Sequence, residues 1–297
     1  MPSHASSGAP ARLAIGVISA GRVGTALGQA WERAGHVVVA TSAISDASRR
    51  RAADRLPEAQ VLPPDEVAAR ADLLLLAVPD DTLAGLVGGL AATGVLRPGQ
   101  IVVHTAGARG VGVLDPLARL GALPLALHPA MTFAGRAEDT ARLASCCFGI
   151  TAADEPGWAV AEALVLEVGA EAARIAEADR PTYHAALAHG ANHLVTLVRD
   201  AVQALESVST GVPAERVLAP LLSAALDNAL RHGDRALTGP VARGDAEAVA
   251  THLRVLTEVD PELAAGYRAL SRRTARRAAA CGLITPDAAR AVLEELR

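Results

Sequence analysis

The sequence contains no lysine, and all 28 basic residues among its 297 positions are arginines. This absence excludes Schiff-base catalysis, phosphate binding by a P-loop lysine and proton donation by a lysine ammonium. Codon bias in a GC-rich genome is the ordinary explanation, and the chemical consequence holds either way. Net charge is −4 and no basic stripe stands out, so we expect no nucleic-acid partner.

Cysteines, aromatic residues and long apolar runs are also scarce. Three cysteines without a CxxC pair make a poor disulfide framework, and no signal peptide is evident, so we expect a reducing cytoplasmic location. Aromatic residues make up 2% of the chain, so the core must consist mainly of Ala, Leu and Val. No run reaches the roughly 18 apolar residues of a membrane span, and we expect no membrane partner.

Short apolar runs alternate with helical stretches in the first half of the chain. The runs expected to form strands lie at residues 12–19, 36–40, 61–62, 72–78, 100–104, 123–128 and 147–151. This alternation predicts an α/β domain with a doubly wound parallel sheet over residues 12–154. Residues 155–297 are rich in alanine and predict a helical domain for substrate binding and dimerisation. Residues 1–11 are expected to form a disordered tail.

The turn after the first predicted strand has the pattern of a dinucleotide-binding loop. The start of the following helix would hold the pyrophosphate, the second glycine would allow close approach, and the third would allow close packing. Serine replaces the first glycine, and we expect it to occupy the turn without a positive φ. The loop residues, all predicted to bind cofactor, are Ser19, Ala20, Gly21, Arg22, Val23 and Gly24.

The second predicted strand indicates which dinucleotide is bound. A carboxylate at its end would hold the ribose 2′-OH of NAD, but the strand ends at Thr41 and Ser42. Arginines follow at residues 49–51, after Asp46. The hydroxyl of Ser42 and the guanidinium of Arg49 suit a 2′-phosphate, so we expect NADP(H) rather than NAD(H). The alternative is that these arginines form a solvated helix face.

Ligands of a doubly wound sheet lie beyond the carboxyl ends of its strands. Val78 and Pro79 end the fourth predicted strand and are expected to line the nicotinamide ribose, with Thr105 beside them. Ala106 and Gly107 follow Thr105, and their small size permits close approach of a substrate.

Two histidines end neighbouring predicted strands. His104 is expected to contact substrate and His128 to take part in catalysis, although such a histidine can also be a purely structural hydrogen-bonding residue. Residues 180–199 predict a helix in which four-residue steps place His184 and Asn192 on one ridge facing a cleft. His189 and His193 lie four residues apart and could bind a metal in principle, but the sequence suggests no third ligand. No metal is therefore expected.

Thr238 and Arg243 flank a helix break in the second half. They either belong to a plain loop, with Asp245 as the N-cap of the next helix, or reach into the substrate cleft. In the second case Arg243 would pair with a carboxylate of the substrate.

Six segments in this order resemble one group of proteins. They read ISAGRVGTAL, VPDDTL, HTAGA, LHPAMTF, YHAALAHGANHLVTL and ALTGPVARGD. The chain resembles two-domain proteins with a Rossmann-like domain followed by a helical domain of unknown function, which include an alternative type of ketopantoate reductase. It is distantly similar to 6-phosphogluconate, hydroxyisobutyrate and prephenate dehydrogenases and to pyrroline-5-carboxylate reductases.

The resemblance implies roles for individual residues. Lysine-dependent ketopantoate reductases carry their lysine where this chain has His184, with an asparagine further along the helix, as Asn192 is here. The segment at His128 is similar to one in prephenate dehydrogenases whose histidine meets the substrate hydroxyl. Thr105 begins a segment that lies where hydroxyisobutyrate dehydrogenases place a substrate-binding loop.

The sequence thus predicts a cytoplasmic, homodimeric NADPH-dependent reductase of a small carboxylate, a 2-oxo acid such as 2-dehydropantoate. His184 or His128 would donate the proton and Asn192 would orient the carbonyl. Two alternatives stay open. One is a prephenate-type or hydroxyacid dehydrogenase, and the other is an NADP-binding sensor without turnover.

Overall fold

The computed structural model describes residues 12–297, and the tail predicted at residues 1–11 lies outside them. The chain forms two compact units that divide between His189 and Gly190. This division falls later than the boundary predicted after residue 154, because the sheet of the first unit continues beyond that point. Each unit is described by itself.

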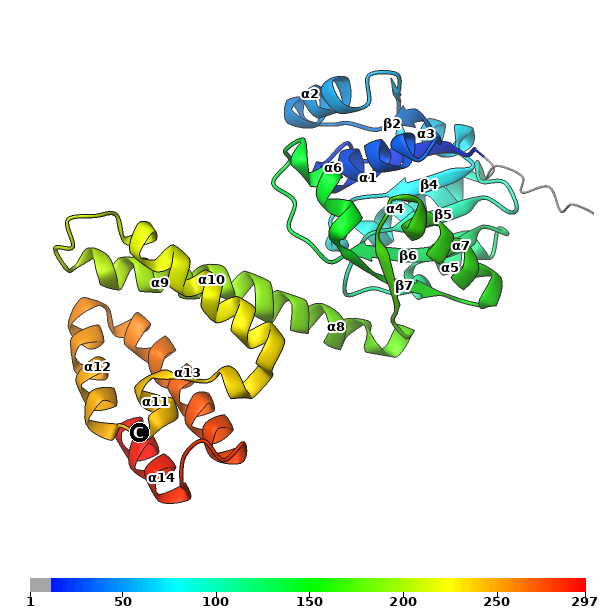
Figure 1. Ribbon diagram of the computed structural model, residues 1–297. Coiled ribbons are helices and arrows are strands. Elements are labelled where there is room, and N and C mark those ends of the chain that lie inside the picture. The colour runs from blue at the N-terminus through cyan, green and yellow to red at the C-terminus, as the bar shows by residue number, and fades with distance from the viewer. Residues whose placement is uncertain (1–11) are drawn as a thin grey trace, which may run out of the picture. The chain divides into compact units, whose positions relative to one another are not determined.

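The first unit is built on an eight-stranded sheet within residues 12–297, in the order β3-β2-β1-β4-β5-β6-β7-β8 (Figure 1). The strands are β1 Ala14–Ile18, β2 Val37–Thr41, β3 Gln60–Val61, β4 Leu73–Leu76, β5 Ile101–His104, β6 Leu123–Pro129, β7 Cys147–Ala152 and β8 Glu171–Arg174. The α-helices are α1 Arg22–Arg33, α2 Asp46–Arg55, α3 Pro64–Arg70, α4 Asp80–Thr93, α5 Asp115–Ala118, α6 Glu138–Arg142, α7 Glu155–Glu167 and α8 Arg180–Leu187. The 3₁₀ turns are η1 Val111–Leu114, η2 Leu143–Ser145 and η3 Glu177–Asp179.

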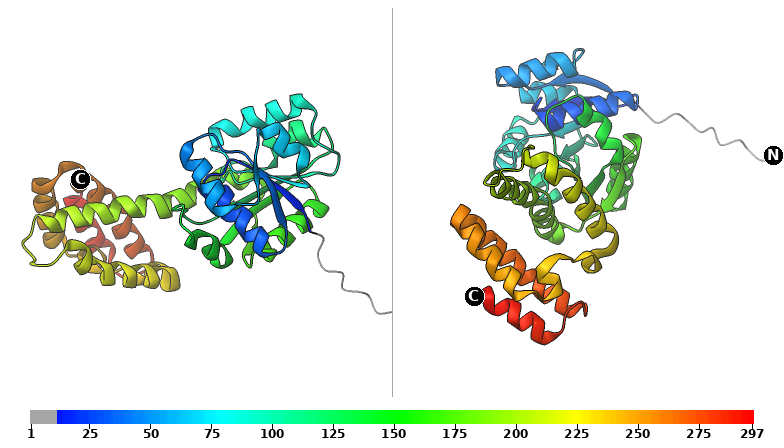
Figure 2. Two further views of the ribbon diagram at one scale, coloured as in Figure 1. Left: turned by 90° about the horizontal axis from the view of Figure 1, so that it is seen from above. Right: turned by 60° about the vertical axis from the view of Figure 1, so that its left-hand side comes forward.

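Helices cover both faces of this sheet, as Figure 2 shows. On one face Val17 and Leu75 pack with Trp31 of α1 and Leu164 of α7. On the other face the alternate strand residues, such as Leu74, pack with α3, α4 and α5. Each strand of a parallel sheet is buried on both sides, so its residues must be apolar on both sides. The predicted doubly wound sheet is confirmed.

One strand runs against the predicted direction. β7 pairs with β6 antiparallel, with His128 opposite Gly149, while β8 is parallel to β7. The sheet is therefore mostly parallel and not wholly so. Apolar runs look alike in either direction, so the run itself carried no signal of this reversal.

The strand order reverses between β1 and β4, where crevices open at the carboxyl ends of the strands. Ile18, Leu76 and His104 are paired in register across β1, β4 and β5. The turns that follow these three residues therefore begin at one edge of the sheet, which is the edge where the sequence predicts ligand binding.

The second unit is helical throughout the residues described. Its helices are α9 His193–Glu206, α10 Ala214–His232, α11 Gly239–Arg243, α12 Ala246–Val259, α13 Pro261–Ala280 and α14 Pro286–Glu295, with the 3₁₀ turn η5 Gly233–Ala236. Side chains of Asp245, Asp260 and Thr285 cap the last three helices. A small core that includes Val249 and Val292 joins α11 to α14.

A π-helical turn, η4 Ala188–Asn192, lies between α8 and α9, and the division of the chain falls within it. The predicted ridge from His184 to Asn192 assumes one continuous α-helix. A π turn has i→i+5 hydrogen bonds, so the four-residue spacing on which this ridge depends does not hold. This part of the prediction was wrong.

Candidate active site

The turn after β1 places Ser19 in the left-handed conformation, with φ +79°. Among residues 12–297 it is the one non-glycine residue with a positive φ, so the prediction that it avoids this conformation was wrong. The conformation costs a non-glycine residue about 1–2 kcal/mol. Ser42 offsets this cost: its Oγ accepts from the Ser19 N–H at 3.0 Å and its carbonyl from the Ala20 N–H at 2.8 Å.

The two glycines of the turn have different tasks. A Cβ at Gly24 would collide with the carbonyl oxygen of Ser19 and lie 3.0 Å from Cγ1 of Val17, so glycine lets α1 pack closely on β1. At Gly21 the nearest atom to a Cβ would be Ser19 Oγ, at 3.4 Å. Gly21 begins α1 without a side-chain cap or an acidic first turn. This helix start can therefore accept an anion such as a pyrophosphate.

The other predicted loop residues lie around this helix start. Ala20 is buried, while Val23 is half-buried in the first turn of α1. Arg22 is exposed, and its Nη1 donates to the carbonyl of Phe133 at 3.4 Å. Arg22 therefore links the turn to the segment that follows β6.

Two arginines of α2 have different surroundings, since one faces the solvent and the other reaches the dinucleotide turn. Arg49 is exposed and lies 3.8 Å from Asp46. Nε of Arg51 donates to the carbonyl of Ala20 at 3.3 Å, so this side chain reaches the dinucleotide turn. Arg49 was the predicted phosphate ligand, because a run of three arginines does not show which of them faces the turn. Ser42 supports the turn and has its hydroxyl engaged there.

The ends of β4 and β5 leave small or half-exposed residues at the ligand edge. Val78 and Thr105 are half-buried and Pro79, which begins α4, is exposed. Ala106 and Gly107 are buried. The predicted neighbours of the nicotinamide thus follow strands whose ends are paired in register.

His104 has both ring nitrogens engaged within its own loop. Nε2 lies 2.9 Å from the carbonyl of Gly110, and Nδ1 accepts from the N–H of Ala106 at 3.1 Å. The side chain has no exposed surface. Burial, followed by the nearby charge of Arg180, lowers the pKa of His104 to about 4. This geometry favours a structural role over the predicted contact with substrate.

His128, Tyr183 and His184 form a cluster over Gly107. Nδ1 of His128 lies 3.0 Å from the Tyr183 hydroxyl, and the rings of His128 and His184 meet edge to face at 5.9 Å. A Cβ at Gly107 would collide with His184 Cδ2 and lie 2.9 Å from Nε2 of His128. Only a glycine at this loop position leaves room for both imidazoles.

Protonation of this cluster is biased by its surroundings. Burial chiefly, and then the charges of His184 and Arg180, lower the pKa of His128 to about 4. His128 is therefore a neutral imidazole at neutral pH and a poor source of protons. Burial raises the pKa of Tyr183, while the Arg180 charge and the Gly149 amide act in the opposite direction.

Arg180 is fully buried beneath this cluster. Its Nε donates to Thr151 Oγ1 at 2.7 Å, and Nη2 donates to the carbonyls of Ala126 and Gly149 at 3.1 and 3.0 Å. Nη1 has no partner, and no carboxylate forms an ion pair with this guanidinium within residues 12–297. Its carbon lies 5.8 Å from the Tyr183 ring centre, and burial lowers its pKa to about 10.

Sequence reasoning missed both Arg180 and Tyr183. Tyr183 directly precedes His184 and is one of only two tyrosines in the chain, which was the available signal. Arg180 gave none, because its partners lie on β6 and β7, far away in the sequence.

The remaining predicted residues belong to the second unit. Asn192 ends the π turn and is exposed. Thr238 begins α11 without a side-chain cap bond, and Arg243 ends that helix exposed to solvent. The predicted helix break at Thr238 and the N-cap at Asp245 are confirmed. The roles in substrate binding stay predictions.

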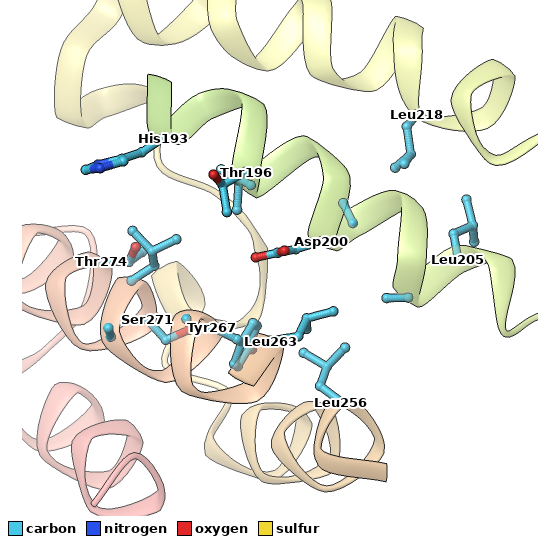
Figure 3. A pocket seen from close by; sticks show the side chains of 16 residues that line it. His193, Thr196, Asp200, Leu205, Leu218, Leu256, Leu263, Tyr267, Ser271 and Thr274 are labelled. Atoms are coloured by element: carbon cyan, nitrogen blue, oxygen red, sulfur yellow. The ribbon is translucent and has the colours of Figure 1, made fainter. Parts of the chain in front are cut away.

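A groove of about 790 Å³ lies between α9 and α13 of the second unit (Figure 3). His193, Thr196 and Asp200 line it from α9, and Tyr267 and Ser271 from α13. Its surface is otherwise mainly apolar, with Leu197, Leu205, Leu218, Leu256, Leu263 and Leu270.

No group of three or more His, Cys, Asp or Glu side chains within residues 12–297 is placed to hold a metal ion. None of the helices in the same residues has the length and apolar character needed to cross a membrane.

The fold and the glycine turn define a dinucleotide-binding class, and family comparison agrees. Residues 1–129 match the Rossmann-like domain, and residues 146–274 match a domain of unknown function (DUF2520). The chain belongs to the proteins that join these two domains, as its resemblance indicated. No curated protein sequence matches it.

Solved structures share the fold at low sequence identity. A protein from Bacteroides fragilis that is named as an NADP oxidoreductase is 24% identical, with a TM-score of 0.73 over 89% of this chain and 98% of that one. A protein from Thermotoga maritima is 17% identical, with a TM-score of 0.66 over 90% and 98%. A reductive aminase from Aspergillus terreus, in complex with NADPH and ethyl-5-oxohexanoate, is 16% identical, with a TM-score of 0.65 over 97% and 100%. The chain therefore shares the fold of these proteins.

Proposed function

We propose that this protein is an NADPH-dependent reductase of a small 2-oxo acid, with 2-dehydropantoate as the first substrate to test. The observation that carries the proposal is the pair of imidazoles of His128 and His184 over Gly107, at the sheet edge that also bears the dinucleotide turn. A carbonyl reductase needs a hydride source, a proton donor and a hydrogen bond to the carbonyl oxygen, and this edge offers residues for each.

The residues of the turn fit a dinucleotide. The uncapped start of α1 suits a pyrophosphate, which could approach closely at Gly21, and Arg51, whose side chain reaches the turn, would supply a cation for a 2′-phosphate. Val78 and Thr105 would flank the nicotinamide ribose. The bound cofactor would supply a hydride to the carbonyl carbon.

The two histidines would then have separate tasks. His184 is half-exposed, and its ring forms no hydrogen bond within residues 12–297. We assign to His184 the transfer of a proton to the developing alkoxide oxygen. His128 is held neutral and is better suited to hydrogen bonding than to proton donation.

The test follows the absorption band of NADPH, with 2-dehydropantoate and a cyclic imine offered together with NADPH, and prephenate and a hydroxyacid offered together with NADP⁺. We expect turnover with the 2-oxo acid and a loss of about 100-fold in kcat for His184→Ala. Turnover of prephenate or of the hydroxyacid with NADP⁺ would instead establish a dehydrogenase. Tight NADPH binding without turnover of any substrate would establish a sensor.

We also propose that the helical unit forms a homodimer. Leucines line the groove between α9 and α13, and Val217, Leu221 and Leu230 are exposed on α10 of the same unit. A groove and an apolar ridge on one unit can satisfy each other in a two-fold pair. A second copy of this chain is therefore the occupant that would cover both surfaces at once.

A further inference from the structure

The hydrogen bonds around Tyr183 determine which nitrogen of His128 carries a hydrogen. The Tyr183 hydroxyl lies 3.0 Å from His128 Nδ1, and this nitrogen is its one hydrogen-bonding partner within residues 12–297. With the hydrogen on Nδ1, the phenol oxygen would be the acceptor of this bond, and its own O–H would have no acceptor within residues 12–297. A buried donor left unpaired costs about 1–3 kcal/mol, and a half-buried donor costs a part of this. Nδ1 is therefore the acceptor, and Nε2 carries the hydrogen.

This Nε2–H faces the candidate substrate loop. Nε2 would lie 2.9 Å from a Cβ at Gly107, so it occupies the space that this glycine leaves open. It forms no hydrogen bond within the described residues, and it is not among their fully buried unpaired polar atoms. A ligand oxygen bound over Gly107 would find there a donor without another partner.

Arg180 fixes the phenol and opposes a second proton on His128. Its three hydrogen bonds join the first residue of α8 to β6 and β7, and Tyr183 follows three residues later. The phenol fits because Gly149 has no Cβ, which would lie 2.5 Å from Cζ and Oη of Tyr183. The other titratable groups that face this pair are His104 on β5, His184 on α8, and Cys146 and Cys147 at β7.

We infer that Tyr183 and Arg180 are positioning residues that hold His128 as a neutral imidazole, so that its Nε2–H donates a hydrogen bond to the carbonyl oxygen of the substrate. This inference rests on the proposed function. The hydride would leave its C–H bond on the reduced cofactor and form the new C–H bond on the substrate, the π electrons of the C=O bond would move to oxygen, and His184 would supply the proton. His128 keeps its hydrogen throughout and polarises the carbonyl.

The first experiment needs no turnover. Nitrogen NMR of the full chain labelled with ¹⁵N-histidine distinguishes protonated from unprotonated ring nitrogens, and His128→Gln identifies the signals. We expect wild-type His128 at pH 7 to be neutral with the hydrogen on Nε2. In Tyr183→Phe we expect a share of Nδ1–H and a pKa raised by about one unit, since one hydrogen bond to the neutral form is lost. Hydrogen on Nδ1 in the wild type, or unchanged signals in Tyr183→Phe, would overturn the inference.

The chain offers a matched control in Tyr267, whose hydroxyl lies 3.0 Å from Nδ1 of His252 in the second unit. Tyr267→Phe should change the His252 signals and leave those of His128 as they are. Arg180→Met should raise the pKa of His128, and Arg180→Lys, which keeps the charge, should restore much of the lowering. If Arg180→Met does not fold, Arg180→Lys and Tyr183→Phe still decide the matter.

The second experiment measures the reaction. We expect Tyr183→Phe to lower kcat about 10-fold with little change in KM, because the hydrogen bond strengthens as charge develops on the oxygen. A change in KM alone would refute the positioning role. Absence of turnover in the wild type, with the expected NMR signals, would overturn the proposed function and leave the assigned tautomer standing.

Discussion

A tyrosine–histidine hydrogen bond occurs in each unit of this protein, and the two pairs are nearly alike. Both have a hydroxyl 3.0 Å from Nδ1, with ring centres 5.6 Å apart for Tyr183–His128 and 5.8 Å apart for Tyr267–His252. Their surroundings differ. The first pair has a second imidazole and a buried guanidinium beside it, whereas the second pair joins α12 to α13.

This difference shows that a local hydrogen bond does not define a site. The first pair lies at a sheet edge, where β5, β6 and the start of α8 meet and where glycines leave room for a ligand. The interior of the first unit is tightly packed, and it holds the buried guanidinium of Arg180 and the two imidazoles whose pKa is lowered. The second unit has one small core and an apolar groove. We therefore expect chemistry in the first unit and association in the second.

The largest expected effect is on the stability of the first unit, from one methyl group added to its packed interior. Gly24→Ala places a Cβ against the Ser19 carbonyl and should lower the free energy of unfolding by about 3 kcal/mol. Urea unfolding followed by tryptophan fluorescence reads this unit alone, because Trp31 and Trp158 both lie in it.

The matched substitution in the second unit is Gly190→Ala, where a Cβ would meet no atom within 4 Å. Its unfolding curve, followed by circular dichroism, should stay within about 0.5 kcal/mol of the wild type. Equal stability of the two variants would refute the tight packing at Gly24.

The next effect is acid sensitivity of the first unit. The pKa of His104 is lowered to about 4, below the ordinary value of 6.5, so the unfolded chain binds a proton that the folded chain refuses. Its contribution to stability is present above pH 6.5 and is lost as the pH falls towards 4. Between pH 7 and pH 5 we expect a loss of about 2 kcal/mol from each of His104 and His128.

His104→Gln should flatten this pH dependence, since it removes one of the two protons involved. Urea midpoints from tryptophan fluorescence at pH 7, 6 and 5 measure the slope. A variant with the slope of the wild type would show that His104 does not titrate as its burial requires.

The sequence was informative where local pattern decides structure. The strands predicted at residues 100–104 and 123–128 are β5 and β6 almost to the residue. Each strand coincides with an apolar run, and β6 ends at a proline, so the features that predict these strands are local in the sequence. The glycine turn was located on the same grounds.

The rest depended on partners distant in the sequence. Ser19 takes a positive φ because Ser42 holds the turn from the next strand. Arg180 is buried because β6 and β7 supply acceptors for it. Likewise, no periodic pattern in the sequence marks the reversed direction of β7 or the π turn before α9. Local propensity cannot report interactions of this kind.

A third prediction tests association. Leu221 on α10 and Leu166 on α7 are both 65% exposed, one in each unit. Leu221→Glu should weaken the homodimer at least about 10-fold, because it places a charge in an apolar interface. Leu166→Glu should leave the dissociation constant unchanged. Sedimentation equilibrium measures both, and equal effects of the two substitutions, or a monomeric wild type, would count against the proposed interface.

The smallest effect concerns the cofactor phosphate. Arg51 reaches the dinucleotide turn, whereas Arg254 of the second unit is exposed and pairs with Glu258. Arg51→Ala should weaken NADPH binding about 5-fold and NADH binding little, because only NADPH carries the 2′-phosphate that a guanidinium recognises. Arg254→Ala should change neither. Fluorescence titration with the two nucleotides measures these ratios. A loss shared equally by NADPH and NADH would assign Arg51 to support of the turn through the Ala20 carbonyl, and the preference for NADP would then need another source.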